Sequence, residues 1–241
     1  MQTNLYVALS AQMALQKRME TIAHNVANTS TAGFRAEEIK FEALLSQTPS
    51  DSVAFASPGR TFLSRASGEF VRTDNLFDVA VEGDAWLGIQ TPQGQVYTRD
   101  GRMRMTEAGQ LETLGGYSIL DAGGAPILLD PNAGPPQIAR DGTVTQNNRQ
   151  VAVIGLFQID QRANLKRFEN SGVIPDRPAT AALDFVKSGM RQGFVERANV
   201  NPVMEISRLI AISRAFEAVS ASISETEASL QSAIRTLASS D

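Results

Sequence analysis

The chain of 241 residues has no cysteine and one histidine. The lack of cysteine excludes disulfides, thiolate nucleophiles, cysteine-bound zinc and iron–sulfur clusters, and one histidine excludes any site that needs two from one chain. The chain also lacks a large net charge, because 22 basic and 26 acidic residues leave a net charge of −4. This balance gives no global electrostatic reason to bind nucleic acid or an anionic membrane. We therefore expect no metal, no other cofactor and no nucleic-acid partner.

Long apolar runs are missing as well. The longest strongly apolar stretch, Val151 to Ile159, is about half the length that a membrane-spanning helix requires. The N-terminal residues up to Gln16 carry no charged side chain, but they lack the basic first region of a signal peptide and contain interrupting polar residues. We interpret them as part of the mature protein. We expect no stable membrane insertion, and an export route without a cleaved Sec signal if the protein leaves the cytoplasm.

The N-terminal region has the spacing of an amphipathic helix with a narrow apolar stripe. Alternating steps of three and four residues connect Leu5, Ala8, Gln12, Leu15, Met19, Ile22 and Val26. This is the spacing of the a and d positions of a coiled coil. It predicts a helix over about residues 4 to 28.

The C-terminal region repeats this pattern over a greater length. Asn201 followed by Pro202 is a helix start signal, because asparagine caps the first turn and proline is tolerated at its first position. One line of positions seven residues apart contains Leu209, Phe216, Ile223, Leu230 and Leu237. The alternate line contains Ile206, Ser213, Ser220, Glu227 and Ile234. Stripes this narrow predict that the two helices pair with each other or with other chains.

The middle of the chain changes to a strand pattern. From Phe77 the apolar residues alternate with polar ones, and glycines then recur about every seven or eight residues, as turns between short strands do. The predicted strands include Trp86 to Gln90, Val96 to Arg99 and, as the strongest one, Val151 to Ile159. These features predict a central antiparallel β domain.

The predicted fold class is α+β, with long N- and C-terminal helices that pair as an antiparallel coiled coil and a central antiparallel β domain. The predicted segments are an N-terminal helix in residues 1–35, an extended connector in 36–75, the β domain in 76–170, a returning connector in 171–200 and a C-terminal helix in 201–241.

Few residues suggest catalysis. His24 lies near the end of the predicted N-terminal helix, and a structural or solvated histidine is favoured over a catalytic one. Asp78, Glu82 and Asp84 could suggest carboxylate catalysis or calcium, but no calcium-loop pattern is present and a solvated strand face is favoured. We therefore expect no catalytic, cofactor-binding or metal-binding residues.

The aromatic and basic residues of the middle region also have simple structural interpretations. Trp86 lies where a strand should pack, which favours a role in the core. Arg99, Arg102 and Arg104 form a small basic cluster without the interleaved aromatics of a single-strand nucleic-acid platform, so a rim or salt-bridge role is favoured.

Three stretches together resemble the signatures of bacterial flagellar rod and hook proteins, the axial proteins of the flagellum. The first is residues 25–35, NVANTSTAGFR; the second is residues 76–87, LFDVAVEGDAWL, with YTRDG at 97–101; the third is residues 199–205, NVNPVME, with RAFE at 214–217. The residues that carry the motif are Asn25, Ala27, Asn28, Thr31, Gly33, Phe34, Asn199, Val200 and Glu205.

This resemblance implies a structural subunit of the flagellar basal-body rod rather than an enzyme, and the length favours the proximal-rod type over the distal-rod type. Such subunits are expected to join through their terminal helices, with copies of themselves and with other proximal-rod and distal-rod proteins. The product is a hollow helical drive shaft that transmits torque and conducts exported subunits. The implied location is the rod within the periplasm, reached through the flagellar type III export apparatus.

The residues predicted to carry this assembly are those of the helical stripes: Leu5, Leu15, Met19, Ile22, Val26, Ile206, Leu209, Phe216, Ile223, Leu230, Ile234 and Leu237. Two other classes of protein stay open at this point. One is a periplasmic glycan-acting enzyme that uses Asp78 or Glu82, and the other is a soluble adaptor with a self-contained helical hairpin.

Overall fold

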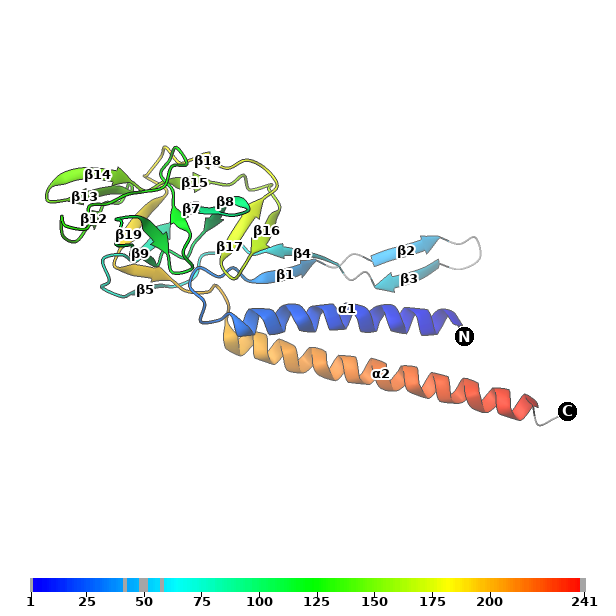
Figure 1. The fold of residues 1–241 in the computed structure, drawn as a ribbon. Helices are drawn as coiled ribbons and strands as arrows, with labels where there is room; N and C mark the ends of the chain where they lie inside the picture. The colour runs from blue at the N-terminus through cyan, green and yellow to red at the C-terminus, as the bar shows by residue number, and fades with distance from the viewer. Residues whose placement is uncertain (1, 41–42, 48–51, 57–58, 239–241) are drawn as a thin grey trace. The chain divides into compact units, whose positions relative to one another are not determined.

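The computed structural model describes residues 2–40, 43–47, 52–56 and 59–238. The chain divides into two compact units. The helical unit contains Met1–Ala27, Glu37–Phe62 and Asn201–Asp241, and the β unit contains Asn28–Ala36 and Leu63–Val200. Both ends of the chain therefore meet in one unit, and most of the middle forms the other (Figure 1).

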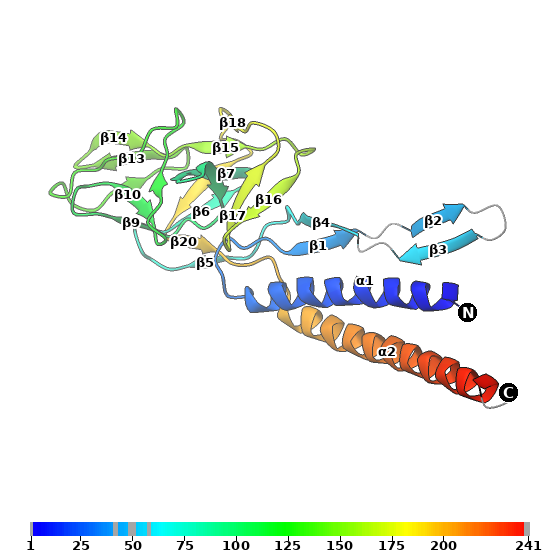
Figure 2. The same cartoon turned by 45° about the vertical axis from the view of Figure 1, so that its right-hand side comes forward.

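The helical unit contains the two predicted helices. Helix α1 is Gln2–Ala27, and helix α2 is Pro202–Ala238, which at 1.5 Å per residue is about 55 Å long. The predicted start of α2 is confirmed, because Oδ1 of Asn201 accepts a hydrogen bond from the backbone N–H of Met204 at 3.1 Å. The helices run antiparallel, side by side (Figures 1 and 2). Neither described helix combines the length and apolarity needed to cross a membrane.

Two strand pairs complete the helical unit, within the range predicted as an extended connector. Strand β1, Glu37–Lys40, pairs with β4, Arg60–Leu63. Strand β2, Ala43–Gln47, pairs antiparallel with β3, Ser52–Ala56. Helix α1 contacts both β1 and β3 (Figure 2).

The structure corrects the helical part of the predicted fold class: the expected long antiparallel coiled coil is not what forms. Helix α1 shares its covered surface between α2 and the strands, whereas a two-stranded coiled coil would present one seam to one partner. Along the described side chains of α2 only Glu205 and Ile212 are buried. The chain is thus α+β, with two adjoining helices of unequal length instead of a continuous coiled coil.

The predicted β character of the middle region is confirmed. Its strands are β5 Phe70–Arg72, β6 Val79–Glu82, β7 Ala85–Thr91, β8 Gly94–Thr98, β9 Met103–Met105, β10 Leu111–Thr113, β11 Ser118–Ile119, β12 Gln137–Ile138, β13 Thr143–Gln146, β14 Arg149–Val153, β15 Leu156–Gln158, β16 Leu165–Phe168, β17 Gly172–Pro175, β18 Thr180–Ala181, β19 Gly189–Gln192 and β20 Phe194–Glu196.

These strands pair antiparallel in four groups. The largest sheet has nine strands and includes the path β16-β17-β8-β7-β11-β10-β9, with β15 joined to β7 and β18 joined to β15. A three-stranded sheet has the order β12-β13-β14, and two further pairs are β19 with β6 and β20 with β5.

The core of the β unit lies around β7 and β8. In β7 every residue except Gln90 is buried, which indicates that both faces of this central strand are covered. Leu87 and Val96 belong to the main apolar cluster. Trp86 belongs to a second cluster with Tyr97 and is 1% exposed, so the prediction of a core role for this tryptophan is confirmed.

The strongest predicted strand, Val151 to Ile159, is wrong as a single element. The chain leaves β14 after Val153 and begins β15 at Leu156. Between them the backbone N–H of Gly155 donates to the carbonyl of Leu120 at 2.9 Å. A Cβ at Gly155 would lie 2.5 Å from the backbone of Asp121, so this close approach requires glycine and interrupts the apolar run.

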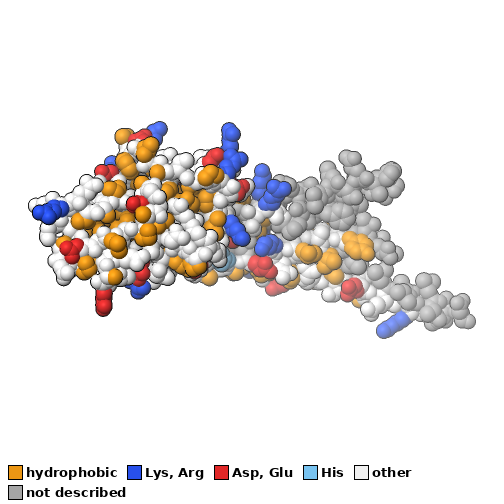
Figure 3. All heavy atoms as spheres, turned by 45° about the horizontal axis from the view of Figure 1, so that its top comes forward, with side chains coloured by type: hydrophobic (Ala, Val, Ile, Leu, Met, Phe, Trp, Pro, Cys, Tyr) orange, Lys and Arg blue, Asp and Glu red, His pale blue; other side chains and the backbone are white. Residues whose placement is uncertain are grey.

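Charged side chains of both signs are interspersed over the face of the molecule that Figure 3 shows.

Candidate functional site

The less exposed side chains of α2 form a single stripe along the helix. Its members are Glu205, Leu209, Ile212, Phe216, Val219, Ile223 and Thr226, at alternating spacings of four and three residues, and Ser213 and Ser220 of the alternate predicted line are half-buried beside it. Of the apolar residues predicted at seven-residue intervals in the C-terminal helix, Leu209, Phe216 and Ile223 belong to this stripe. Ile206 and Glu227 of the alternate line are exposed, and the residue before each of them belongs to the stripe. The predicted side chains of Leu5, Leu230, Ile234 and Leu237 lie outside the described part.

Helix α1 contributes smaller and partly polar residues. Among the predicted positions Ile22 is buried, and Leu15, Met19 and Val26 are half-buried. Nε2 of Gln12 donates a hydrogen bond to Oγ of Ser220 on α2 at 3.0 Å. This bond shows the register of the two helices: Gln12 of α1 lies beside Ser220 of α2.

The helices do not close tightly at this level. A cavity of about 240 Å³ is lined by Val7, Ala8 and Ala11 from α1 and by Val219 and Ser222 from α2. Its mixed, mostly small side chains explain why the apolar stripes of the sequence do not produce continuous interlocking packing.

The signature residues after α1 stop the helix and reverse the chain. Asn25 bonds in both directions with the backbone of Glu37: Nδ2 donates to its carbonyl and Oδ1 accepts from its N–H, each at 2.9 Å. Ala27 is the last residue of α1. In the following turn Oδ1 of Asn28 accepts from the Thr31 hydroxyl at 3.0 Å, and its carbonyl accepts from the Thr31 N–H.

Gly33 and Phe34 then fix the signature loop within the β unit. Gly33 has a φ of +66°, and a Cβ there would lie 2.2 Å from the backbone nitrogen of Asp100. Its N–H donates to the carbonyl of Glu196 at 2.8 Å. Phe34 is fully buried, with the guanidinium of Arg167 4.4 Å from its ring centre. Glycine is therefore required by both conformation and space.

A buried ion triad lies beside this loop. Nη1 of Arg35 is 2.8 Å from Oε1 of Glu196, and Nε of Arg99 is 3.2 Å from Oε2 of Glu196. All three side chains are at most 2% exposed. The backbone N–H of Gly68 also donates to Oε1 of Glu196 at 2.7 Å, and Arg35 donates to the carbonyl of Ala66.

The surroundings of the triad are strongly desolvated. Burial lowers the pKa of Arg99 to about 10, although the charge of Glu196 acts to raise it. Burial likewise lowers the pKa of Arg35. The carbonyls of Val81, Gly83 and Ala85 accept hydrogen bonds from Arg99 at 2.6 to 2.9 Å.

The triad has a structural role rather than a reactive one, because its carboxylate is held by two cations and a backbone donor. The sequence suggested a rim or salt-bridge role for Arg99, and the structure shows a salt bridge that is buried rather than on a rim. It missed Glu196, for which the local sequence contains no signal.

The third signature region, at 199–205, is tied to the first. Oδ1 of Asn199 accepts from the N–H of Ala36 at 2.6 Å, and Nδ2 donates to the carbonyl of Ala66 at 2.8 Å. Val200 is half-buried and ends the β unit. In the helical unit, Glu205 is 7% exposed and its Oε1 accepts from Arg208 at 2.6 Å.

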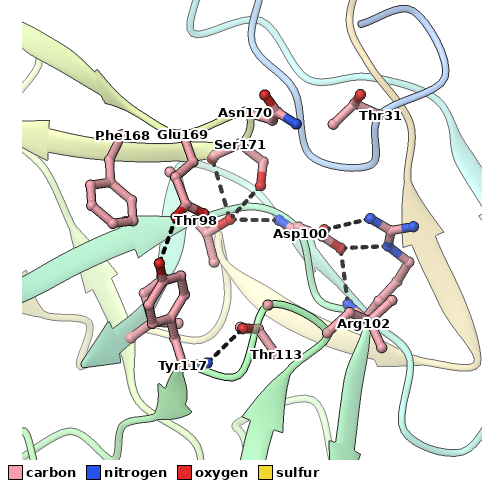
Figure 4. Close-up of a pocket in the computed structure, with 14 residues that line it drawn as sticks. Thr31, Thr98, Asp100, Arg102, Thr113, Tyr117, Phe168, Glu169, Asn170 and Ser171 are labelled. Carbon is pink, nitrogen blue, oxygen red and sulfur yellow. Dashed lines mark hydrogen bonds and ion pairs between the residues drawn. The ribbon is translucent and has the colours of Figure 1, made fainter. Parts of the chain in front are cut away.

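A polar pocket of about 180 Å³ opens in the β unit (Figure 4). Asp100 accepts two bonds from Arg102, at 2.8 and 2.7 Å. The hydroxyl of Thr98 donates to the carbonyl of Ser171 at 3.2 Å and accepts from the N–H of Asp100. These groups bond to one another, so the wall is a hydrogen-bonded network that joins neighbouring turns.

The opposite wall of this pocket contains a tyrosine–carboxylate pair. The hydroxyl of Tyr117 donates to Oε1 of Glu169 at 2.5 Å, and this bond raises the pKa of Tyr117. Glu169 has a φ of +49° in the turn between β16 and β17. The pair holds that turn against the turn between β10 and β11 (Figure 4).

The residues considered for catalysis lie elsewhere and have partners. Asp78 accepts a hydrogen bond from Asn75 at 3.0 Å, and Glu82 pairs with Arg191 at 2.6 Å. Asp84 accepts from the side chain of Gln161. His24 lies 3.7 Å from the carboxylate of Glu37. Among the described residues no group of three or more histidine, aspartate or glutamate side chains could hold a metal ion.

Three family models match the chain, in the order of the three signature regions. They are the flagella basal body rod protein over residues 5–35, the flagellar hook protein FlgE/F/G D1 domain over 80–146, and the flagellar basal body rod FlgEFG protein C-terminal region over 191–236.

Full-length relatives extend this result. The chain is 52% identical over 239 residues, 99% of both chains, to the flagellar basal-body rod protein FlgF of Mesorhizobium japonicum. It is 47% identical over 240 residues, 100% of both chains, to the protein of the same name from Rhizobium meliloti. The flagellar basal-body rod protein FlgG of Bacillus subtilis is 29% identical over 258 residues, 95% of this chain and 96% of that one.

The chain belongs to the family of flagellar basal-body rod proteins. Within this family the predicted proximal-rod type is confirmed, because the 52% and 47% identical relatives are both FlgF proteins and the FlgG relative is more distant. The family consists of structural proteins and not enzymes, so the predictions of a structural rod subunit and of no enzymatic activity are confirmed. Membership also implies a place in the basal-body rod and assembly with other rod subunits.

Proposed function

We propose that the helical unit is the part through which this structural rod subunit joins its neighbours, and that the β unit makes lateral contacts around it. The observation that carries the proposal is that both chain ends form one unit with paired helices, joined by the Gln12–Ser220 hydrogen bond. A subunit held only by its β unit would have no need of a long helix such as α2, whose described side chains are mostly exposed.

The assembled product is a hollow helical shaft that transmits torque and conducts exported subunits, with copies of this chain and other proximal-rod and distal-rod subunits as neighbours. When subunits join through contacts between unlike surfaces and the contacts do not close into a ring, they form a helical assembly of this kind. The periplasmic position and transit through the flagellar type III export apparatus belong to the same proposal and rest on family resemblance.

Within each subunit, the stripe residues Leu15, Met19 and Ile22 of α1 and Leu209, Phe216 and Ile223 of α2 stabilise the paired helices. A carboxylate at position 216 is expected to separate them, because it would lose part of its hydration without gaining a partner.

The test is Phe216→Asp, introduced into cells that lack their own copy of the protein. We expect loss of swimming and loss of the subunit from purified basal bodies, with the buried environment of Trp86 unchanged in the fluorescence of the purified protein. Ala218→Asp is the matched control, because Ala218 is exposed on the same helix and lies outside the stripe, and this variant should swim normally. Normal swimming and normal recovery of Phe216→Asp in basal bodies would overturn the proposal.

A further inference from the structure

Large apolar side chains are exposed in two stripes on the helical unit. On α1, Tyr6, Leu9 and Met13 are 61%, 47% and 59% exposed. On α2, Val203, Ile206 and Ile210 are 71%, 46% and 50% exposed. We call these the N stripe and the C stripe. Each has steps of three and then four residues, so its members share one side of their helix.

The N stripe lies in an uncharged segment. The first charged side chain of the sequence is Lys17, four residues after Met13, so no charged side chain of α1 lies beside Tyr6 or Leu9. Exposed helix faces in water normally carry charged and polar residues. A face with three large apolar side chains and one charged neighbour, Lys17, therefore indicates a surface that another protein covers.

The two stripes lie at opposite ends of the helix pair. The Gln12–Ser220 bond marks a shared level. From Ser220 back to Ile206 is fourteen residues, about 21 Å along α2, and from Gln12 back to Leu9 is three residues, about 4.5 Å along α1. Because the helices are antiparallel, these two displacements point in opposite directions and add to about 25 Å.

We propose that the N stripe of one subunit packs against the C stripe of a neighbouring rod subunit, with the two subunits staggered by about 25 Å along the helix axis. The inference rests on the proposed function. The stripes differ in position and side chains, so the contact is between unlike surfaces and leaves one stripe of each subunit for the next neighbour. A repeated contact of this kind gives an open helical array.

The occupant of each stripe is the terminal helix of a rod subunit. The two rod-protein family models that match the terminal regions cover residues 5–35 and 191–236, and these ranges include the N stripe and the C stripe. Other subunits of the family therefore have corresponding helices. The partner surface of the N stripe is the first turns of a C-terminal helix, and that of the C stripe is the first turns of an N-terminal helix.

Photo-cross-linking in assembled basal bodies tests this pairing. A benzophenone amino acid replaces Leu9 in one strain and Ile206 in another, basal bodies are purified after irradiation, and cross-linked peptides are sequenced by mass spectrometry. We expect position 9 to capture the start of a rod subunit's C-terminal helix and position 206 to capture the N-terminal helix. The controls, at exposed Arg18 and exposed Ala215, lie away from the stripes and should lose these products.

The outcomes separate the pairing from the proposed function. The pairing is overturned if the subunit is recovered in basal bodies but position 9 cross-links to another N-terminal helix, to a β unit or to a protein outside the rod. This outcome leaves the proposed function intact. Absence of the unmodified subunit from basal bodies overturns the function itself.

Cysteine variants give a second readout, because the chain has no cysteine of its own. Leu9→Cys and Ile206→Cys should react with a water-soluble maleimide in the purified subunit and lose that reaction in basal bodies. Equal reaction in both preparations overturns the pairing even if the photo-reactive variants fail to assemble.

Discussion

Arg35 and Glu196 form a buried ion pair, with Nη1 of the arginine 2.8 Å from Oε1 of the glutamate. Arg35 belongs to the segment that follows α1, and Glu196 is the last residue of β20, shortly before α2 begins. Arg99 is the third member, 3.2 Å from the other carboxylate oxygen. The pair therefore joins the outgoing and returning segments of the chain inside the β unit, and Glu196 compensates two buried cations.

Glu196→Gln should destabilise the β unit strongly. The amide keeps the shape of the side chain but removes the charge that opposes two buried guanidinium groups. Removing one partner of a buried ion pair costs about 3–5 kcal/mol of the free energy of unfolding. Urea unfolding of the full chain, followed by the fluorescence of its one tryptophan, Trp86, measures this change.

The control for this prediction is Glu69→Gln. Glu69 is 75% exposed and lies 3.9 Å from Arg197, and surface pairs contribute about 0–1 kcal/mol. Equal urea midpoints for Glu196→Gln and Glu69→Gln would show that the buried triad does not stabilise the fold.

Gly33→Ala should lower the melting temperature by far more than the left-handed backbone conformation at this position alone would cause. An added Cβ would lie 2.2 Å from the backbone nitrogen of Asp100, and that neighbour is backbone that cannot swing away. Gly116→Ala is the matched control: its φ of +83° is also left-handed, but nothing lies within 4 Å of its Cβ position.

The left-handed conformation by itself costs about 1–2 kcal/mol in a residue with a Cβ, and we expect a loss of this size at Gly116. At Gly33 the clash adds to it, so the melting temperature should fall considerably further. Similar melting temperatures for the two variants would contradict the close approach of the signature loop to Asp100.

The sequence predicts the helices and their start signals because these depend on local spacing and capping. Asn201 caps α2 as expected. Sequence spacing does not predict which elements share the covered face of α1, because the strands that contact it come from a region with little periodicity. The apolar stripes therefore suggested a coiled coil that the structure does not contain.

The buried triad could not be predicted for a related reason. Glu196 follows two apolar residues in a three-residue strand, and nothing local distinguishes an inward-pointing glutamate from a solvated one. Its compensating charges, Arg35 and Arg99, come from distant parts of the sequence. The signature containing Gly33 did indicate the loop, because an unusual backbone conformation leaves a residue-type signal.

Acid should weaken the β unit partly through Asp176. The hydrogen bond from the Asn164 side chain to its carboxylate, 2.7 Å between Nδ2 and Oδ2, is the main cause of a lowered pKa, and the Asn164 N–H adds to it. A lowered pKa in the folded state gives stability that is present above the unfolded value of 3.8 and is lost as the pH falls through the folded value.

Asp176→Asn removes this titration. The difference in urea midpoint between wild type and Asp176→Asn should therefore shrink between about pH 5 and about pH 2.5. Glu107→Gln, a change at an exposed carboxylate, serves as the reference. A wild-type advantage that stayed constant over this range would argue against the Asn164 bond as a source of acid sensitivity.

Asn201→Ala should loosen the start of α2 without affecting the β unit. The Asn201 side chain satisfies the N–H of Met204, which has no partner within the helix, and loss of such a cap costs about 0.5–2 kcal/mol. Hydrogen exchange of the amides in the first turns of α2 should accelerate, whereas Asn201→Ser keeps a capping oxygen and should exchange nearly as wild type.

Because Val203, Ile206 and Ile210 of the C stripe lie in these same turns, Asn201→Ala should also reduce recovery of the subunit in basal bodies, and Asn201→Ser should restore it. Unchanged exchange in Asn201→Ala would show that neighbouring contacts, not the cap, hold the first turn in place.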